Sequence, residues 1–170
     1  MLEKKGSKVK SVGIFLKDND SKAVEFAINV CAFFDEHQVK VYCPSNFKRD
    51  LRKTNSHFVK PENIPSLVDL ILVLGGDGTF LHAAGYMSQV SKPMIGIHIG
   101  YLGFLTEVQA DEALNYLRDC IDGNYVYKMR STLSGEVIRS GKKIEIFALN
   151  DIVITKSASK RIIEVEMKYN

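Results

Sequence analysis

The sequence predicts an α/β fold in which a mostly parallel sheet carries helices on both faces, followed by the first strands of an incomplete all-β second domain. Two observations lead to this prediction: strand-like and helix-like segments alternate up to about Gly123, whereas only strand-like segments follow it. The length agrees, because 170 residues, 45% hydrophobic and 25% charged, suffice for one domain and part of another. We therefore divide the chain into an α/β domain over residues 1–123 and a partial antiparallel domain over residues 124–170.

The chain opens with a predicted strand, helix and strand. Residues 9–16 are rich in β-forming side chains and end at the turn-forming sequence KDND. Over residues 21–36, apolar side chains recur at steps of three and four, which is the pattern of an amphipathic helix packed on a sheet. Residues 39–42 form a second short strand, and the polar, basic segment 44–65 is expected to be a loop with one helical turn.

The most hydrophobic segment is a predicted central strand. Residues 67–74 contain seven aliphatic side chains interrupted only by Asp69, as expected for a parallel strand buried on both faces. A helix over residues 79–87, a buried strand over 94–97 and an amphipathic helix over 111–121 follow. This alternation indicates a Rossmann-like sheet with helices on both of its faces.

Beyond Gly123 the hydrophobic period changes to two. Strands are predicted over residues 125–138, 143–149 and 152–155, with a turn at 140–142. Residues 163–169 also alternate between apolar and charged side chains, and the alternation continues to Asn170 without a returning strand. Because such a sheet has an unpaired edge, we expect that the chain is a fragment or that another chain completes the sheet.

Charge, hydropathy and cysteine content narrow the classes of function. With 23 Lys and Arg against 20 Asp and Glu, the net charge of +3 gives no reason to expect nucleic acid as a partner. No apolar run approaches the roughly 18 residues that cross a bilayer, and the apolar stretch near the N-terminus is too short for a signal peptide. We therefore expect a cytoplasmic protein without a membrane partner, in which three cysteines without CxxC spacing are reduced and buried.

Two further groups of residues carry no predicted site. The four histidines are dispersed, so no metal-ligating residue is assigned. The basic runs at residues 48–53 and 156–161 are expected to be solvated surface, although the second is serine-rich and has the composition of a loop that contacts phosphate.

A glycine-rich loop follows the predicted central strand in the sequence LILVLGGDGTFLHAA. Its glycines permit positive φ and let the backbone approach a ligand, and the helix that starts near Thr79 offers unpaired N–H groups to a phosphate. The carboxyl end of a parallel strand is also where open α/β sheets bind ligands. The loop matches neither the P-loop nor the dinucleotide fingerprint, so neither is assigned.

Asp77 is the informative residue of this loop, because a carboxylate among phosphate-binding amides repels the ligand unless it has a separate task. Two tasks are compatible with its chemistry: to accept a proton from an attacking hydroxyl, or to help hold Mg²⁺. The alternative is structural, with Asp77 or Thr79 capping the helix while the glycines form a tight turn. The residues alone leave these interpretations open.

Three segments together resemble the NAD kinase family: GGDGTFLHAA at residues 75–84, GIHIGYLGFLTE at 96–107 and ALNDIVI at 148–154. GGDGT alone is shared with diacylglycerol and sphingosine kinases, whereas the other two segments, in this order, point to NAD kinases. The resemblance implies transfer of the terminal phosphate of ATP, or of polyphosphate, to the adenosine ribose 2′-hydroxyl of NAD to give NADP. It also implies Mg²⁺ bound with ATP, and a homo-oligomer, either a dimer or a tetramer.

The resemblance assigns expected roles to individual residues. Asp77 is similar to the general base that acts on the 2′-hydroxyl, and the loop around the phosphates corresponds to Gly75, Gly76, Gly78 and Thr79. Phe104 resembles the aromatic residue beside the NAD adenine, with a core phenylalanine as the alternative. Asn150 and Asp151 resemble an Asn-Glu pair that binds NAD through ribose and base groups, with a β-turn between two strands as the alternative.

The sequence also departs from the family pattern. His98 stands where Asn is common, and imidazole has a different donor geometry and can titrate near neutrality. Asp151 is one methylene shorter than the usual Glu. A second GDG segment and a Thr/Ser/Gly/Tyr-rich stretch are not in this sequence, which leaves open whether this exact chain catalyses by itself. A lipid kinase with the same loop, or a non-catalytic nucleotide-binding module, are the alternative functions.

Overall fold

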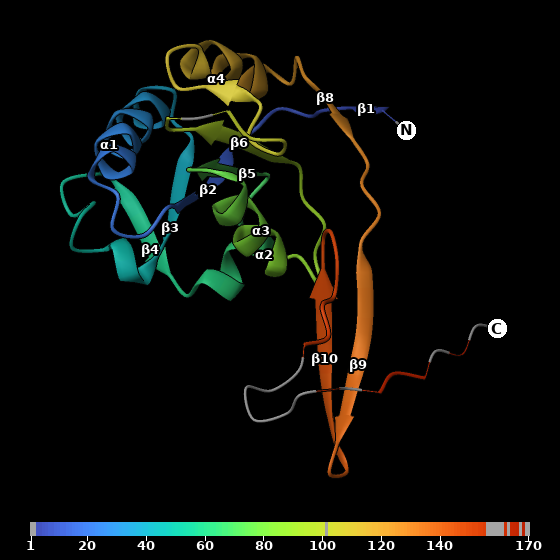
Figure 1. Cartoon of the computed structure of the whole chain (residues 1–170). Helices are drawn as coiled ribbons and strands as arrows, with labels where there is room; N and C mark the ends of the chain where they lie inside the picture. Colours follow the sequence, from blue (N-terminus) through green and yellow to red (C-terminus); the bar gives the residue numbers. More distant parts are fainter. Residues whose placement is uncertain (1–2, 101, 156–161, 163, 167, 169–170) are drawn as a thin grey trace.

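The computed structural model describes residues 3–100, 102–155, 162, 164–166 and 168. Its centre is a six-stranded sheet in which every neighbouring pair of strands is parallel (Figure 1). The strand order is β4-β3-β2-β5-β6-β7, made of β2 (Ser11–Leu16), β3 (Lys40–Pro44), β4 (Ser56–Val59), β5 (Leu70–Leu74), β6 (Met94–His98) and β7 (Val108–Gln109). The predicted parallel sheet is thereby confirmed.

Helices cover both faces of this sheet, as predicted. On one face, α1 (Ser21–Glu36) and α4 (Ala113–Asp122) bury Phe34 and Leu117 against Leu72 of β5. On the other face lie α2 (Ile64–Leu67) and α3 (Asp77–Gly85), which bury apolar side chains against the alternate residues of β5, Ile71 and Val73. Side chains of β5 enter both cores because successive residues of a strand point to opposite faces.

The α1 helix begins where its sequence provides a cap. The Asp20 side chain accepts hydrogen bonds from the backbone N–H groups of Lys22 and Ala23, at 3.1 and 3.2 Å. These two groups are among the donors that have no partner within a helix, and a capping carboxylate satisfies them. The helix therefore starts at Ser21, the predicted residue.

The prediction of a loop over residues 44–65 is wrong in part. This segment contains β4, the short helices η1 (Ser45–Phe47) and η2 (Pro61–Asn63), and the first residues of α2. β4 pairs only with β3 and lies at the edge of the sheet. An edge strand of four residues has one neighbour and a half-solvated face, so it lacks the continuous apolar run that marks β5. The four cationic residues predicted to be solvated surface are exposed: Lys48, Arg49, Arg52 and Lys53.

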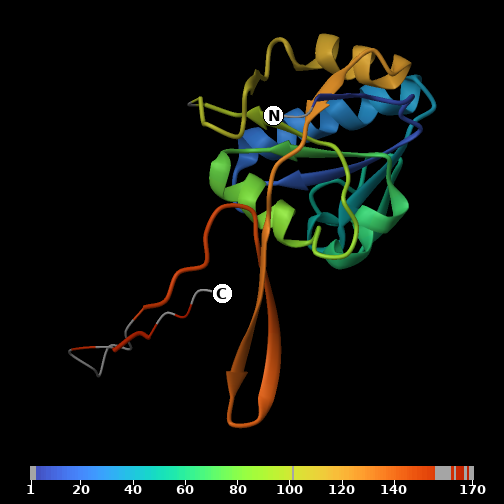
Figure 2. The same ribbon diagram turned by 90° about the vertical axis from the view of Figure 1, so that its right-hand side faces the viewer.

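Two antiparallel pairs of strands accompany the parallel sheet in the described part of the chain. The strand β1 (Glu3–Lys5) pairs with β8 (Val126–Lys128), and β9 (Leu133–Arg139) pairs with β10 (Lys142–Ala148) in a hairpin. The hairpin turn uses Ser140 and Gly141, whose φ values are 51° and 76°. Both views show this hairpin projecting away from the parallel sheet and its helices (Figure 2).

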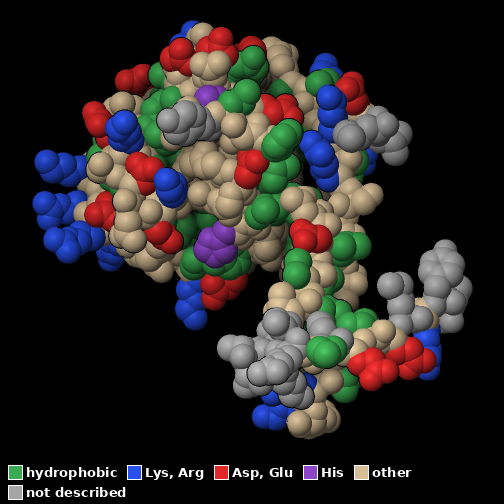
Figure 3. Space-filling view, viewed as in Figure 1, with side chains coloured by type: hydrophobic (Ala, Val, Ile, Leu, Met, Phe, Trp, Pro, Cys, Tyr) green, Lys and Arg blue, Asp and Glu red, His purple; other side chains and the backbone are tan. Residues whose placement is uncertain are grey.

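The chain after the hairpin differs from the prediction. Residues 152–155 form no strand, so that predicted strand is wrong. Ile152, Val153 and Ile154 are exposed, and hydrophobic side chains are visible along this lower part of the molecule in Figure 3. A strand requires a neighbouring strand for its backbone groups, and the described residues give this segment none. Within 163–169, residues 164–166 and 168 are not in a strand, and the other positions lie outside the described residues, as does the basic run 156–161. The division near residue 123 stays a prediction.

Candidate functional site

The glycine-rich loop lies at the carboxyl edge of the sheet, between β5 and α3. Gly75 directly follows β5, and its N–H donates to the carbonyl oxygen of Ile97 in β6 at 3.0 Å. The α3 helix then starts at Asp77, two residues earlier than predicted, with Gly76 at its N-cap position. No side chain caps this helix, so the alternative in which Asp77 or Thr79 serves as a cap is wrong.

The three glycines differ in what suits them to the loop: Gly75 has a positive φ of 159° and is closely packed, whereas Gly76 and Gly78 face open space. Neither Gly76 nor Gly78 has a positive φ, so that part of the sequence prediction is wrong for both. A Cβ atom on Gly75 would stand 2.6 Å from Thr79 Oγ1, closer than side chains tolerate. At Gly76 and Gly78 no atom of the described residues is recorded within 4 Å of the corresponding point, so a ligand can approach the backbone there.

The Asp77 carboxylate binds a second loop, residues 103–106, which connects β6 to β7. Its Oδ2 accepts a hydrogen bond from Phe104 N–H at 2.9 Å, and its Oδ1 accepts one from Leu105 N–H at 2.9 Å. The hydroxyl of Thr106 also donates to Oδ1, at 3.3 Å. A carboxylate oxygen offers two lone pairs, so Oδ1 is fully used and Oδ2 retains one lone pair.

These hydrogen bonds set the ionisation of Asp77. The backbone N–H groups of Leu105 and Phe104 favour the charged form and lower the pKa of Asp77 below its ordinary value of 3.8. The carboxylate is therefore negatively charged at neutral pH. It stands in the first turn of α3, where the helix dipole also favours a negative charge.

Sequence reasoning missed two residues that hold Asp77 in place, Gly103 and Thr106. A Cβ atom on Gly103 would stand 2.7 Å from Asp77 Cγ and 2.6 Å from Thr106 Oγ1, so glycine permits the carboxylate to reach the loop backbone. Thr106 is fully buried, and its hydroxyl contacts Asp77. The only sequence signal was their place within LGFLT, a segment separated from Asp77 by more than twenty residues.

Phe104 is not a core residue, because 92% of its surface is exposed while its backbone holds Asp77. The core alternative is therefore wrong. Asn150 and Asp151 are exposed at the end of β10, and since no strand follows them in residues 151–155, the alternative of a turn between two strands is also wrong. No hydrogen bond joins either residue to Asp77 within the described part of the chain, so the two halves of the predicted site remain separate here.

His98 ends β6 and is 7% exposed. Neither of its ring nitrogens has a hydrogen-bond partner among the described residues. Buried polar atoms are usually paired, so these nitrogens are available to a group that the structure does not contain. The ligand contact that the family pattern predicts at the position of His98 stays a prediction.

A cavity away from Asp77 lies beside β6. It has a volume of about 810 Å³ and runs along β6, between α3, α4 and the base of the hairpin, where Phe80, Met94, Leu105 and Leu149 line it. None of the predicted site residues lines this cavity.

Among the described residues, no group of three or more His, Cys, Asp and Glu side chains is arranged to hold a metal ion. In the same part of the chain, no helix is long and apolar enough to span a membrane. The three cysteines are free and buried, as predicted.

Comparison with protein families gives one match that covers most of the chain. Residues 12–125 match the family described as the ATP-NAD kinase N-terminal domain. Except for Ser11, the first residue of β2, the matched range contains the sheet from β2 to β7, the glycine-rich loop and the 103–106 loop.

Curated relatives and a solved structure agree with this match. The chain is 36% identical over 161 residues to the NAD kinase of Natranaerobius thermophilus and 35% identical over 159 residues to that of Geobacter sulfurreducens. These alignments cover 94% and 93% of this chain but 56% and 55% of the relatives, so the chain spans about half of their length. The crystal structure of yeast NADH kinase complexed with NADH superposes with a TM-score of 0.76 at 18% identity, over 85% of this chain and 48% of that one, which confirms the fold.

Proposed function

We propose, from the premise that this chain belongs to the ATP-NAD kinase family, that it contributes the phosphate loop and the catalytic base of an NAD kinase. In the proposed reaction, the terminal phosphate of ATP is transferred to the 2′-hydroxyl of the adenosine ribose of NAD, and NADP and ADP are the products. The chain forms the N-terminal part of this enzyme.

One observation carries the proposal: Asp77 is fixed by the neighbouring loop and yet keeps one unused lone pair on Oδ2. A general base needs a defined position and a free lone pair to accept the proton of the attacking hydroxyl. In the proposed step, the 2′-oxygen attacks the terminal phosphorus in line, the bond to the leaving ADP oxygen breaks, and Oδ2 takes the hydroxyl proton.

The loop beside Asp77 suits the phosphates of the donor. Gly76 and Gly78 have open space where side chains would stand, and the first turn of α3 directs backbone N–H groups outward. Gly75 and Thr79 pack against each other and hold the loop in this shape. Phosphoryl transfer depends mainly on such positioning and on stabilisation of charge.

The NAD-binding residues are proposed from the family motif and are supported by their exposure. The Phe104 ring is free to stack on the adenine, because almost all of its surface is exposed. Asn150 and Asp151 are exposed and are proposed to bind the ribose and base groups of NAD. The family relation, rather than a contact within the described residues, links them to Asp77.

Mg²⁺ is proposed to enter as the complex with ATP. Because the unused lone pair of Asp77 Oδ2 is assigned to the proton, no residue of this chain is proposed to hold Mg²⁺, which keeps several waters and binds mainly through substrate phosphates. When bound, Mg²⁺ offsets the negative charge of the phosphates. Polyphosphate is the alternative donor.

The intact protein is proposed to be a cytoplasmic homo-oligomer. Light scattering measures its molar mass in solution, and a mass of two or four chains is expected.

A coupled assay tests the proposed function. The intact protein is incubated with ATP, Mg²⁺ and NAD, and the product is detected with an NADP-specific dehydrogenase. We expect NADP to form only when NAD and a phosphate donor are both present. Phosphorylation of a diacylglycerol in place of NAD would identify a lipid kinase, and binding of ATP and NAD without turnover would identify a nucleotide-binding module; either result contradicts the proposal.

A further inference from the structure

The proposed reaction needs positive charge beside the phosphate loop, because the donor carries several negative charges that the transition state does not remove. The loop itself provides none, since GGDGTFLHAA contains neither Lys nor Arg. The same holds for residues 98–107, which follow β6 on one side of the loop. Among the residues that the structure describes, the segment after β2 is a further neighbour, and with the start of α1 it contains Lys17 and Lys22.

The segment after β2 lies against the phosphate loop. β2 and β5 are adjacent, and the chain continues from β2 to β3 on one side of the sheet but from β5 to β6 on the other. Such a switch point opens a crevice at the carboxyl ends of the two strands, where α/β proteins bind ligands. The N–H group of Lys17 donates to the carbonyl oxygen of Leu74, the last residue of β5, at 3.0 Å.

The Lys17 side chain starts directly at this crevice. The point where a Cβ atom on Gly75 would stand is 3.2 Å from Lys17 Cβ and 2.6 Å from Thr79 Oγ1. Lys17 and Thr79 therefore contact the same glycine of the phosphate loop from two different elements. The long, flexible stem of Lys17 allows its ammonium group to reach a phosphate held by the loop.

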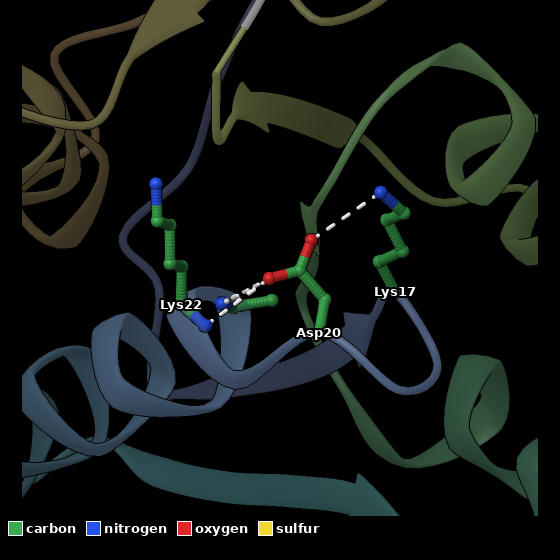
Figure 4. Close-up of polar contacts among 4 residues, drawn as sticks. Lys17, Asp20 and Lys22 are labelled. Atoms are coloured by element: carbon green, nitrogen blue, oxygen red, sulfur yellow. Dashed lines mark hydrogen bonds and ion pairs between the residues drawn. The ribbon is translucent and has the colours of Figure 1, made fainter.

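The Lys17 ammonium group pairs with Asp20, the cap of α1. One oxygen of Asp20 accepts from the N–H groups of Lys22 and Ala23, and the other lies 3.3 Å from Lys17 Nζ (Figure 4). The Asp20 side chain is 19% exposed and fixed by its capping bonds, whereas that of Lys17 is 59% exposed. An exposed ion pair of this kind contributes little, so a multiply charged phosphate competes for the ammonium group.

We propose that Lys17 binds the phosphates of the donor nucleotide, and that its ammonium group exchanges the carboxylate of Asp20 for phosphate oxygens when the donor arrives. This inference rests on the proposed function and adds a binding residue to its phosphate site. Lys17 neutralises part of the donor charge, on the opposite side of the phosphate loop from the 103–106 loop that holds Asp77. Its contact is made with the donor and not with NAD.

The test is Lys17→Gln in the intact protein, assayed with ATP and Mg²⁺ at saturating NAD. Loss of a charge-assisted phosphate contact is expected to raise the KM for ATP by about 10- to 100-fold, while the Kd for NAD stays unchanged. Lys17→Arg keeps the charge and is expected to restore most of the affinity. The matched control is Lys10→Gln, because Lys10 is exposed and precedes the same strand at its opposite end.

The outcomes separate this inference from the proposed function. If the wild-type protein forms NADP and Lys17→Gln keeps the wild-type KM for ATP, the role of Lys17 is refuted and the kinase is not. An equal change in Lys10→Gln, or a matching loss of NAD affinity, also refutes it. If the wild-type protein forms no NADP, the proposed function fails. Calorimetric titration with Mg-ATP then still tests Lys17, and a Kd that is equal in wild type and Lys17→Gln refutes its role.

Discussion

The contact between Gly103 and Asp77 leads to a quantitative prediction for Gly103→Ala. The new Cβ atom would clash with Asp77 Oδ1 and stand 2.7 Å from Asp77 Cγ, whereas ordinary van der Waals contact begins near 3.4 Å, so the carboxyl group must retreat by at least about 0.7 Å. A displacement approaching 1 Å in a catalytic group costs about 10²-fold. We therefore expect kcat for NADP formation to fall by roughly 10- to 100-fold in the intact protein.

The reason for this loss is displacement rather than unfolding. Overpacking of this size costs about 1–3 kcal/mol, which leaves most domains folded. The measurement is kcat from the coupled NADP assay, together with the midpoint of urea unfolding. Gly85→Ala is the matched control, because Gly85 ends α3 and no atom lies within 4 Å of its missing Cβ. A Gly103→Ala enzyme with kcat within threefold of wild type, or an equal loss in Gly85→Ala, would refute the reasoning.

Three further predictions concern single side chains. Asp77→Asn is expected to lower kcat by about 10²- to 10⁴-fold while NAD still binds, and an unchanged kcat removes Asp77 from the mechanism. Phe104→Ala is expected to weaken NAD binding by about tenfold without shifting Tm, because the ring is exposed and is proposed to stack on the adenine; an unchanged Kd, measured by calorimetry, contradicts this. Asp69→Asn is expected to cost about 1.5–3 kcal/mol at pH 7 in urea unfolding, because Asp69 Oδ2 accepts bonds from the N–H of Lys10 and from the N–H and hydroxyl of Ser11.

The pH dependence of the Asp69 effect has a definite sign. Partial burial raises the pKa of Asp69, but the hydrogen bonds from Lys10 and Ser11 outweigh it and hold the pKa below 3.8. A carboxylate with a lowered pKa stabilises the folded state above the unfolded pKa and loses that contribution as the pH falls through the folded value. The difference between wild type and Asp69→Asn is therefore constant from pH 7 to 5 and narrows below about pH 4. A gap that stays constant down to pH 2.5 would contradict the assignment.

The sequence predicted those parts of the fold whose residues are buried on a regular period. β5 was located within a few residues because it is a continuous apolar run, which is typical of a strand buried on both faces. α1 was located because its apolar side chains recur at steps of three and four. β1, β4 and β7 were missed. β1 has the sequence EKK and is held only by pairing with β8, so nothing in its own residues marks it as a strand.

In the candidate site, too, the sequence identified some residues and could not identify others. Asp77 was identified because a carboxylate among glycines is chemically out of place, a feature that lies within five residues of sequence. Gly103 and Lys17 could not be identified, because each acts on the loop from another element. Their spacing along the chain gives no information on the 3.0 Å bond between Lys17 and Leu74, or on the packing of Gly103 against Asp77.

The hydrogen bonds that hold Asp77 also reduce its basicity, so its proposed role as the base depends on how these bonds are distributed between its two oxygens. Oδ1 accepts two of the three hydrogen bonds, from Leu105 and Thr106, whereas Oδ2 accepts only that from Phe104. A proton taken up on the free lone pair of Oδ2 therefore leaves both bonds to Oδ1 in place. The 103–106 loop, which includes Phe104, is therefore expected to stay attached to Asp77 during the proposed proton transfer.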